Sequence, residues 1–224
     1  MRLSPSGLGR RGRLQSRTPR ASRAKRSTLI SLESILPALG AFGGTFVYAS
    51  FFEWTLHRFL MHRSYLLRYP FQTHALTHHR LFRHDESYHL ARPEDIPKVR
   101  FAVWNAPLLI GLHVPLLWLV GRWTGWPMLV PGVLAMTLYY TLYETLHWCM
   151  HVPKDRWIEK TSAFRWLTAH HRAHHQLHDS NLNVVLPVAD FVFRTLRPWK
   201  PPARPATAPS APAPPVSAVE VGPR

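Results

Sequence analysis

Three apolar stretches stand out along a chain that is otherwise polar and basic, and they predict its longest helices. They cover about residues 28–56, 101–120 and 126–146. A helix that crosses a bilayer needs about 20 mostly apolar residues, which the second and third stretches provide. Only residues 121–125 separate these two, so they predict a tight helical hairpin. The alternative is two buried core helices of a soluble protein, although uncharged runs of this length with aromatic ends are rare there.

The basic side chains predict how this hairpin is oriented. Its turn contains only Arg122, whereas the segments 58–100 and 154–200 carry eight basic residues each. Because basic segments stay on the cytoplasmic side of a membrane, we expect both long segments in the cytoplasm and the turn outside. The chain is therefore predicted to be an integral membrane protein.

The first apolar stretch is ambiguous because Glu33 and Pro37 interrupt it. If it spans the membrane, the basic arm before it lies outside, against the same charge rule. A re-entrant or interfacial helix would keep the arm inside, and so would a start codon chosen upstream of the true first residue. The pattern leaves these alternatives open.

The two ends of the chain differ in composition from the middle. Residues 1–27 carry nine basic side chains and no apolar periodicity, so we expect a disordered arm. Residues 199–224 are dominated by Pro and Ala, which predicts a second disordered segment. One all-α membrane domain, residues 28–198, lies between them. Cys149 is the only cysteine, which excludes an intrachain disulfide and a cysteine-based zinc site.

The formal net charge of +16 first suggests a nucleic acid or an anionic membrane surface as a partner. The N-terminal arm accounts for nine of the basic side chains, and no recognised nucleic-acid-binding fold accompanies that arm. A nucleic-acid binder is thus the weakest interpretation, and we expect no nucleic-acid partner.

Ten of the 15 histidines fall into four tight groups beside the apolar stretches. Neutral imidazole is a strong ligand for iron, zinc and copper. Ten side chains are too many for one ion, whereas two ions with four to six positions each can use them. The grouping therefore predicts a dinuclear metal site under a cytoplasmic, histidine-rich helical cap. The groups are His57 and His62; His74, His78 and His79; His147 and His151; and His171, His174 and His175.

Helical geometry predicts which histidines of a group point together. In the third group the spacing is four residues, so both imidazoles share one face of a helix. In the second group the first two share a face, and His79 is turned about 100° away. All three of the fourth group are expected to point the same way. The pair of the first group, five residues apart, converges best if the helix ends or widens between them.

Other interpretations of the histidines are available. A pair on a helix is often only a solvated face, and a histidine-rich tract can bind metal adventitiously. His113 stands alone within an apolar stretch, where a polar contact between helices is favoured over metal binding. The remaining four histidines are expected to act at most as outer hydrogen-bond donors or as exchanged ligands; they are His84, His89, His170 and His178.

Carboxylates are scarce near these groups, unlike in soluble di-iron bundles, which use Glu bridges. Glu144 lies three residues before His147, and Glu53 lies four residues before His57. We expect these two carboxylates to accept hydrogen bonds from ligand imidazoles and so to orient them. The metal site is accordingly predicted to consist mainly of histidine.

Five segments together resemble the fatty acid hydroxylase/sterol desaturase superfamily of membrane di-iron enzymes, and the first segment is most similar to the fatty acid 2-hydroxylase branch. The last segment matches the family pattern in part, but Asn183, Ala189 and Arg194 replace Gly, Trp and Gly there. Asp190 matches and joins the expected outer acceptors. The segments are EWTLHRFLMH (53–62), HALTHH (74–79), HWCMH (147–151), HRAHH (171–175) and NLNVVLPVADFVFRT (181–195).

The resemblance implies two iron ions, O2 as a co-substrate and oxidation of an unactivated C–H bond of a membrane lipid. Zinc would suit the same ligands but has no redox chemistry. No haem segment, glycine fingerprint or cysteine cluster is present, so a separate electron-transfer protein is expected. The implied function is hydroxylation of a fatty acid or fatty-acyl lipid. The alternatives are a sterol or carotenoid hydroxylase or desaturase, and a non-catalytic metal-binding or transport protein of the membrane.

Overall fold

The computed structural model describes residues 32–200, and within that range the chain forms helices and no strand. The predicted all-α fold is confirmed for this part of the chain. The predicted disordered arm, residues 1–27, and residues 201–224 of the predicted tail lie outside the described residues. Trp199, which composition assigned to the tail, contacts Arg172, whose guanidinium carbon lies 5.2 Å from the indole centroid.

The helices include two π-helical turns, which follow α1 and α2 directly. Shorter 3₁₀ turns occupy the loops. The α-helices and π turns are α1 (Leu32–Leu56), η1 (His57–Met61), α2 (Arg68–Thr73), η2 (His74–His78), α3 (His79–Leu81), α4 (Asn105–Thr124), α5 (Leu129–His151), α6 (Ser162–Gln176) and α7 (Val188–Val192). The 3₁₀ turns are η3 (Glu86–Tyr88), η4 (Pro93–Lys98) and η5 (Trp157–Lys160).

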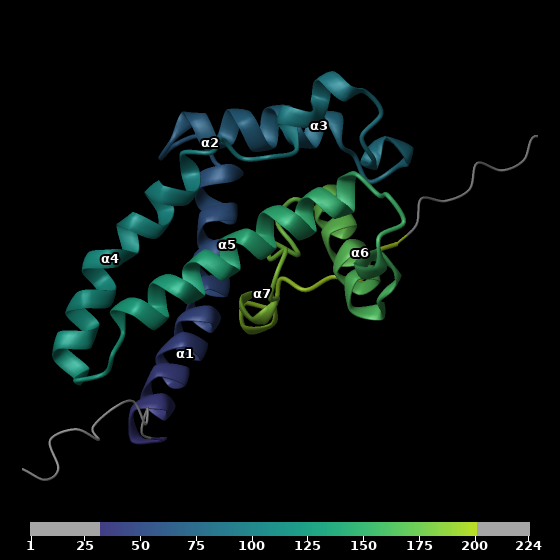
Figure 1. Cartoon of the computed structure of the whole chain (residues 1–224). Helices are drawn as coiled ribbons and strands as arrows, with labels where there is room; N and C mark the ends of the chain where they lie inside the picture. The colour runs from purple at the N-terminus through teal and green to yellow at the C-terminus, as the bar shows by residue number, and fades with distance from the viewer. Residues whose placement is uncertain (1–31, 201–224) are drawn as a thin grey trace, which may run out of the picture.

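Helices α4 and α5 form the predicted hairpin (Figure 1). Helix α4 ends at Gly125, whose φ of 73° lies in the left-handed region that glycine adopts without a steric penalty. Its backbone N–H donates to the carbonyl of Gly121 at 3.0 Å. Helix α5 continues beyond the predicted apolar stretch to residue 151, and it therefore carries the third histidine group on its last turn.

Helix α1 runs beside α5, and both lead from the hairpin end of the molecule towards the histidines (Figure 1). Ala49 of α1 packs against Met136 and Tyr139 of α5 in one apolar cluster. Helix α4 is joined to α1 by a buried polar contact, in which Tyr48 Oη lies 3.2 Å from His113 Nε2. The predicted role of His113 as a polar contact between helices is confirmed.

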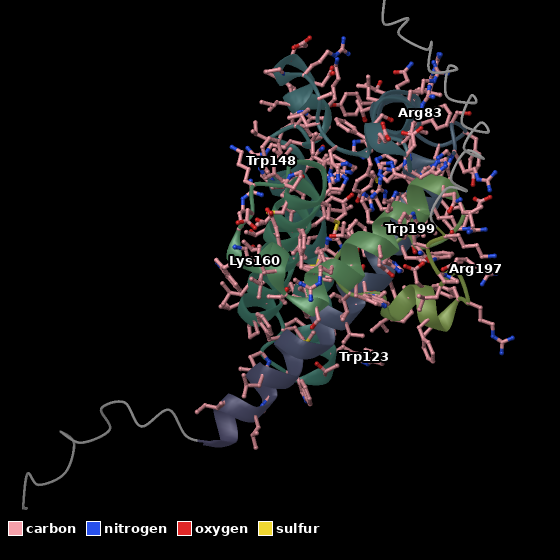
Figure 2. All side chains as sticks on the ribbon, turned by 90° about the vertical axis from the view of Figure 1, so that its right-hand side faces the viewer. Arg83, Trp123, Trp148, Lys160, Arg197 and Trp199 are labelled. Carbon is pink, nitrogen blue, oxygen red and sulfur yellow. The ribbon has the colours of Figure 1, made fainter. Side chains whose placement is uncertain are left out.

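Two helical segments, Ile35–Met61 and Asn105–Thr124, are long and apolar enough to cross a membrane. The third predicted span is not among them, because the second half of α5 is rich in polar side chains. Only 11% of the apolar window in α4 is buried, whereas a core helix of a soluble protein would be mostly buried. Figure 2 shows Trp123 at the hairpin end of the molecule and Arg83 at the other end.

The contact between α4 and α5 depends on Gly132. A Cβ atom at this position would lie 2.6 Å from Leu117 Cδ2, whereas a Cβ at Gly111 would meet nothing within 4 Å. We expect Gly132→Leu to force the hairpin apart and to destabilise the protein by about 1–3 kcal/mol. Thermal unfolding in detergent measures this change, with Gly111→Leu as the matched control. Equal melting temperatures for both variants would contradict the close packing.

Candidate metal centre

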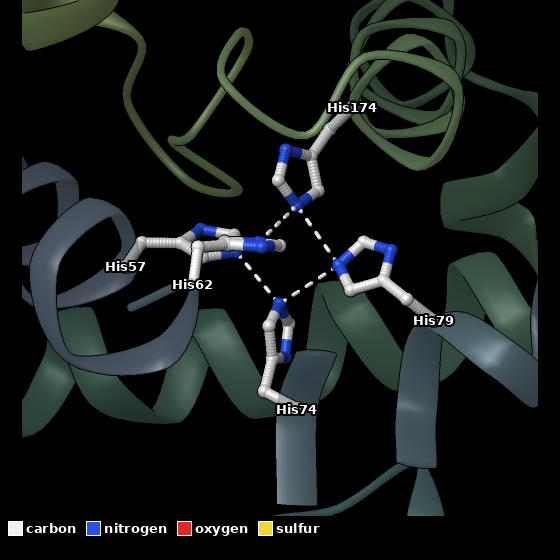
Figure 3. Close-up of side chains that lie close together, drawn as sticks. All are labelled: His57, His62, His74, His79 and His174. Atoms are coloured by element: carbon white, nitrogen blue, oxygen red, sulfur yellow. Dashed lines mark hydrogen bonds between the residues drawn. The ribbon is translucent and has the colours of Figure 1, made fainter. Parts of the chain in front are cut away.

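All ten grouped histidines converge between α1, α5, α6 and the α2–α3 segment, and they divide into two groups of five. The ligand atoms of each group lie within 4.8 Å of one another. Figure 3 shows the first group, in which the imidazoles point towards one centre. The first group consists of His57, His62, His74, His79 and His174; the second consists of His78, His147, His151, His171 and His175.

The π turns explain how residues five apart reach the same centre. In η1 the backbone N–H of His62 donates to the carbonyl of His57 at 3.2 Å, five residues back. In η2 the N–H of His79 donates to the carbonyl of His74 in the same way. A π turn holds more residues than an α turn, so positions i and i+5 come close to one face. The expected widening between His57 and His62 is confirmed.

The structure corrects two predictions of shared direction. His74 and His78 were expected to point together, but they belong to different groups, because the π turn pairs His74 with His79 instead. The three histidines of α6 were also expected to point the same way. His174 faces the first group while its neighbours in the motif face the second, because α6 lies between the two centres.

Backbone carbonyls orient half of the imidazoles. A carbonyl can only accept a hydrogen bond, so each bonded Nδ1 must carry the proton, and the Nε2 lone pair is then directed towards the centre. The bonds from Nδ1 to carbonyl oxygen are His57 to Leu182 (2.6 Å), His78 to Lys98 (3.1 Å), His151 to Tyr88 (2.8 Å), His174 to Ser180 (2.9 Å) and His175 to Phe82.

The spacing of the Nε2 atoms tests whether a metal ion fits the first group. The distance is 2.8 Å from His57 to His74, 3.0 Å from His74 to His79 and 3.1 Å from His79 to His174. With metal–nitrogen bonds of about 2.1 Å, neighbouring ligand atoms lie about 3.0 Å apart at right angles and about 3.4 Å apart in a tetrahedron. The observed distances are short enough for one metal ion to be bound by these nitrogens together.

The second group contains buried polar atoms that a bound ion would satisfy. The Nε2 atoms of His78 and His147 are buried and have no hydrogen-bond partner within the described residues. His171 Nε2 lies 3.2 Å from His151 Nε2 and 3.0 Å from His175 Nε2. One imidazole proton cannot serve both neighbours at full strength. A cation accepts all these lone pairs at once, so the donor set fits a metal here too.

Burial lowers the pKa of the grouped histidines that lie outside the apolar helices, which favours their neutral form. Burial lowers the pKa of His78 to about 4, although its hydrogen bond to Lys98 acts in the opposite direction. Burial, together with the neighbouring imidazoles, holds the pKa of His74 and His174 well below the ordinary value. A neutral imidazole has a free lone pair, so the ligands need not lose a proton before binding a metal.

Neither Glu53 nor Glu144 contacts an imidazole within residues 32–200, which differs from the expected role. The buried carboxylate of Glu53 accepts hydrogen bonds from Tyr139 Oη at 2.5 Å, from Asn183 Nδ2 at 3.0 Å and from the backbone N–H of Val184 at 2.6 Å. Glu144 accepts a long hydrogen bond from the N–H of Phe101 at 3.4 Å and a further one from the side chain of Tyr140. Glu53 thus joins α1, α5 and the 182–184 loop.

Asp190 supports the same loop from its other side. Its carboxylate accepts the backbone N–H groups of Leu182 and Asn183 at 2.9 and 2.8 Å, and His170 Nε2 donates to it at 3.1 Å. Burial alone would raise the pKa of Asp190, but the hydrogen bonds from His170 and its other donors outweigh burial and lower it. Asp190 therefore positions His57 indirectly, by fixing the loop that provides the Leu182 carbonyl.

Two residues that depart from the family pattern have defined places. Asn183 donates to Glu53 and to the carbonyl of Ser50, which the sequence pattern did not indicate. Arg194 adopts a φ of 58°, in the left-handed region that favours glycine. The glycine expected there would fit this backbone without strain, whereas an arginine pays roughly 1–2 kcal/mol. Arg194 thus keeps the left-handed turn that a glycine would adopt at this position.

The spare histidines take different places. His170 binds Asp190 and is not among the ten ligands. His178 is exposed beside the first group, where its ring centroid lies 4.5 Å from that of His79. The structure places neither His84 nor His89 in either group.

No family model matches the chain, and no curated protein and no solved structure matches it.

The division into two groups predicts how metal binding responds to single substitutions. We expect two metal ions per chain in the wild type, and one in either His174→Ala or His171→Ala, because each variant removes a ligand from a different group. Inductively coupled plasma mass spectrometry of the purified protein measures this, with His84→Ala as a control that retains two. Two ions in His174→Ala would contradict the assignment.

Proposed function

We propose that this protein catalyses O2-dependent hydroxylation of a fatty-acyl lipid at a pair of histidine-bound iron ions, as enzymes of the fatty acid hydroxylase/sterol desaturase superfamily do. The observation that carries the proposal is the meeting of two groups of five neutral imidazoles with an apolar cavity. That cavity is lined by His57 of the first group.

The apolar cavity lies between α1, α4 and α5, the three helices that the sequence assigns to the membrane. Its wall includes Phe52 of α1, Ile110 of α4 and Met136 of α5, and it extends to His57 and Met61. A cavity of this chemistry favours a hydrocarbon chain over a polar substrate. A lipid can enter it sideways from the bilayer, because α4 exposes most of its apolar surface.

Redox metal is required by the chemistry of such a substrate. An unactivated C–H bond offers no charge or polarity for acid–base catalysis, and two iron ions with O2 and two electrons would supply the oxidising power. The protein itself would hold the imidazoles with their lone pairs inward. Its apolar cavity would keep water away from the hydrocarbon chain of the substrate. Zinc would suit the same ligands but has no redox chemistry, so the proposed reaction calls for iron.

The arrangement of the helices supports a membrane position in which all the grouped histidines lie on one side. Helix α1 is continuous over 25 residues, which disfavours a re-entrant segment that must reverse direction. Its N-terminal part lies at the hairpin turn, since a Cβ atom at Gly40 would come 2.7 Å from the Trp126 ring. We therefore propose that α1, α4 and α5 cross together, with both the hairpin turn and the start of α1 outside.

The electrons in this proposal come from a separate protein. Exposed basic side chains such as Arg83, Arg165 and Arg194 lie on the histidine-bearing part of the molecule. Opposite charges on two partners steer their encounter. An acidic redox protein is the partner that this surface would favour.

Topology can be tested by single-cysteine labelling in a Cys149→Ser background. We expect Thr124→Cys to react with an impermeant reagent in intact cells, and Arg83→Cys to react only after the membrane is permeabilised. The reason is that the basic segments flank the histidines while the hairpin turn has one basic residue. The opposite labelling pattern would reverse the proposed orientation.

Activity is expected to depend on all four histidine segments. Loss of an outer contact to a ligand typically costs 10- to 100-fold in metal affinity or activity, so replacing His57, His78, His151 or His174 by Ala should cost at least as much. Hydroxylated lipid, measured by mass spectrometry with O2 and an added electron donor, is the readout. Removal of residues 201–224 serves as the control and should leave activity largely intact. Full activity of His151→Ala would rule out the proposed site.

A further inference from the structure

We infer that the substrate is an acyl lipid with an anionic headgroup, which binds to Arg100 in a polar cavity next to the metal centre. This inference rests on the proposed function and specifies its substrate class. It is carried by a second cavity, which differs from the apolar one in both lining and charge.

The polar cavity lies between the α2–η2 segment and residues 97–105. His74, His78 and His147 line its inner part, so it reaches both groups of metal ligands. Lys98 and Arg100 also line it, and no carboxylate does. The first residue of α4, Asn105, is at its edge, which adds the partial positive charge of a long helix's N-terminus. The cavity is therefore suited to an anion.

The two cations differ in how far they are already neutralised. Lys98 Nζ is paired with Asp95 Oδ1 at 2.6 Å. Arg100 is exposed and forms no ion pair within 4.0 Å in the range 32–200, although the carboxylate of Glu144 is close enough to attract it. Its guanidinium carbon instead lies 4.7 Å from the centroid of the Trp148 ring. Stacking on an aromatic ring fixes the guanidinium plane and leaves its N–H edge free for a carboxylate or phosphate.

The polar and apolar cavities adjoin at a single aromatic side chain. Phe101 follows Arg100 directly and lines both cavities. Its ring stacks on that of Tyr143 with centroids 5.4 Å apart, and Tyr143 in turn stacks on His147 at 5.6 Å. Phe101 therefore stands between a headgroup at Arg100 and the apolar cavity, and its ring must turn aside before the lipid chain can pass. Along that path the chain lies next to ligands of both metal groups.

A neutral lipid would leave the polar cavity without a matching group. An anionic headgroup, by contrast, satisfies Arg100 with two parallel hydrogen bonds, the geometry that guanidinium offers to an oxyanion. The headgroup then determines which end of the lipid lies at the metal centre. Arg100 is accordingly a specificity-determining residue, whereas Lys98 only adds to the local potential.

Equilibrium binding tests this without any turnover. The metal-loaded protein in detergent, kept free of O2 and reductant, is titrated with oleate, oleyl phosphate and methyl oleate by displacement of a fluorescent fatty acid. We expect the wild type to bind both anionic lipids at least tenfold more tightly than the ester. Arg100→Gln should abolish this preference without changing the affinity for methyl oleate, and Arg100→Lys should retain part of it.

The matched control is Arg58→Gln, because Arg58 also stacks on a tryptophan, with its guanidinium carbon 5.3 Å from the Trp54 ring, but lines neither cavity. It should keep the full preference. Equal binding of oleate and methyl oleate by the wild type, or an unchanged preference in Arg100→Gln with two metals bound, would overturn the inference. Inorganic phosphate that binds as tightly as oleyl phosphate would overturn the assignment to a lipid.

These outcomes are separate from those of the proposed function. A protein that selects anionic lipids but yields no hydroxylated product under O2 refutes the hydroxylase and leaves the headgroup site intact. A protein that hydroxylates oleate and methyl oleate with equal efficiency refutes the headgroup site alone.

Discussion

The structure depends on two groups of five imidazoles, nine of them buried and His62 partly buried, whose ligand atoms converge on two points. Such an arrangement is unfavourable by itself, because buried polar atoms without partners lose their hydrogen bonds to water. The fold limits this cost on the outer side of the rings, where five backbone carbonyls accept from Nδ1. On the inner side, a cation would satisfy the remaining lone pairs. A bound metal would therefore stabilise the folded domain.

Hydrogen bonds around the site bring distant parts of the chain together. The 182–184 loop lies more than a hundred residues after α1, yet it holds His57 through one carbonyl and Glu53 through one amide N–H. Asp190 secures this loop from the opposite side. Because Glu53 precedes His57 by one helical turn, the two contacts fix both the position and the rotation of the end of α1.

The sequence predicted the ligand types and the main helices, because apolar length and histidine spacing are local properties. It did not predict which imidazole joins which centre, since that depends on how α6 and η2 sit between the two centres. The carbonyl acceptors were not predictable either, because every residue has a carbonyl and none is marked by its side chain. The sequence showed that Glu53 and Glu144 lie close to histidines along the chain. In the structure, however, both accept hydrogen bonds from groups other than imidazoles.

The π turn at His57–Met61 links the spacing of the two histidines to the type of helical turn between them. In an α-helix, side chains four residues apart share a face, whereas in the π turn the fifth residue takes that place. Removing one residue between His57 and His62 would therefore restore an α turn and leave both imidazoles on one face. Removing a second residue would rotate the later imidazole by about 100° and turn it away from the centre. This segment thus tolerates the loss of one residue by changing its helix type, but not the loss of two.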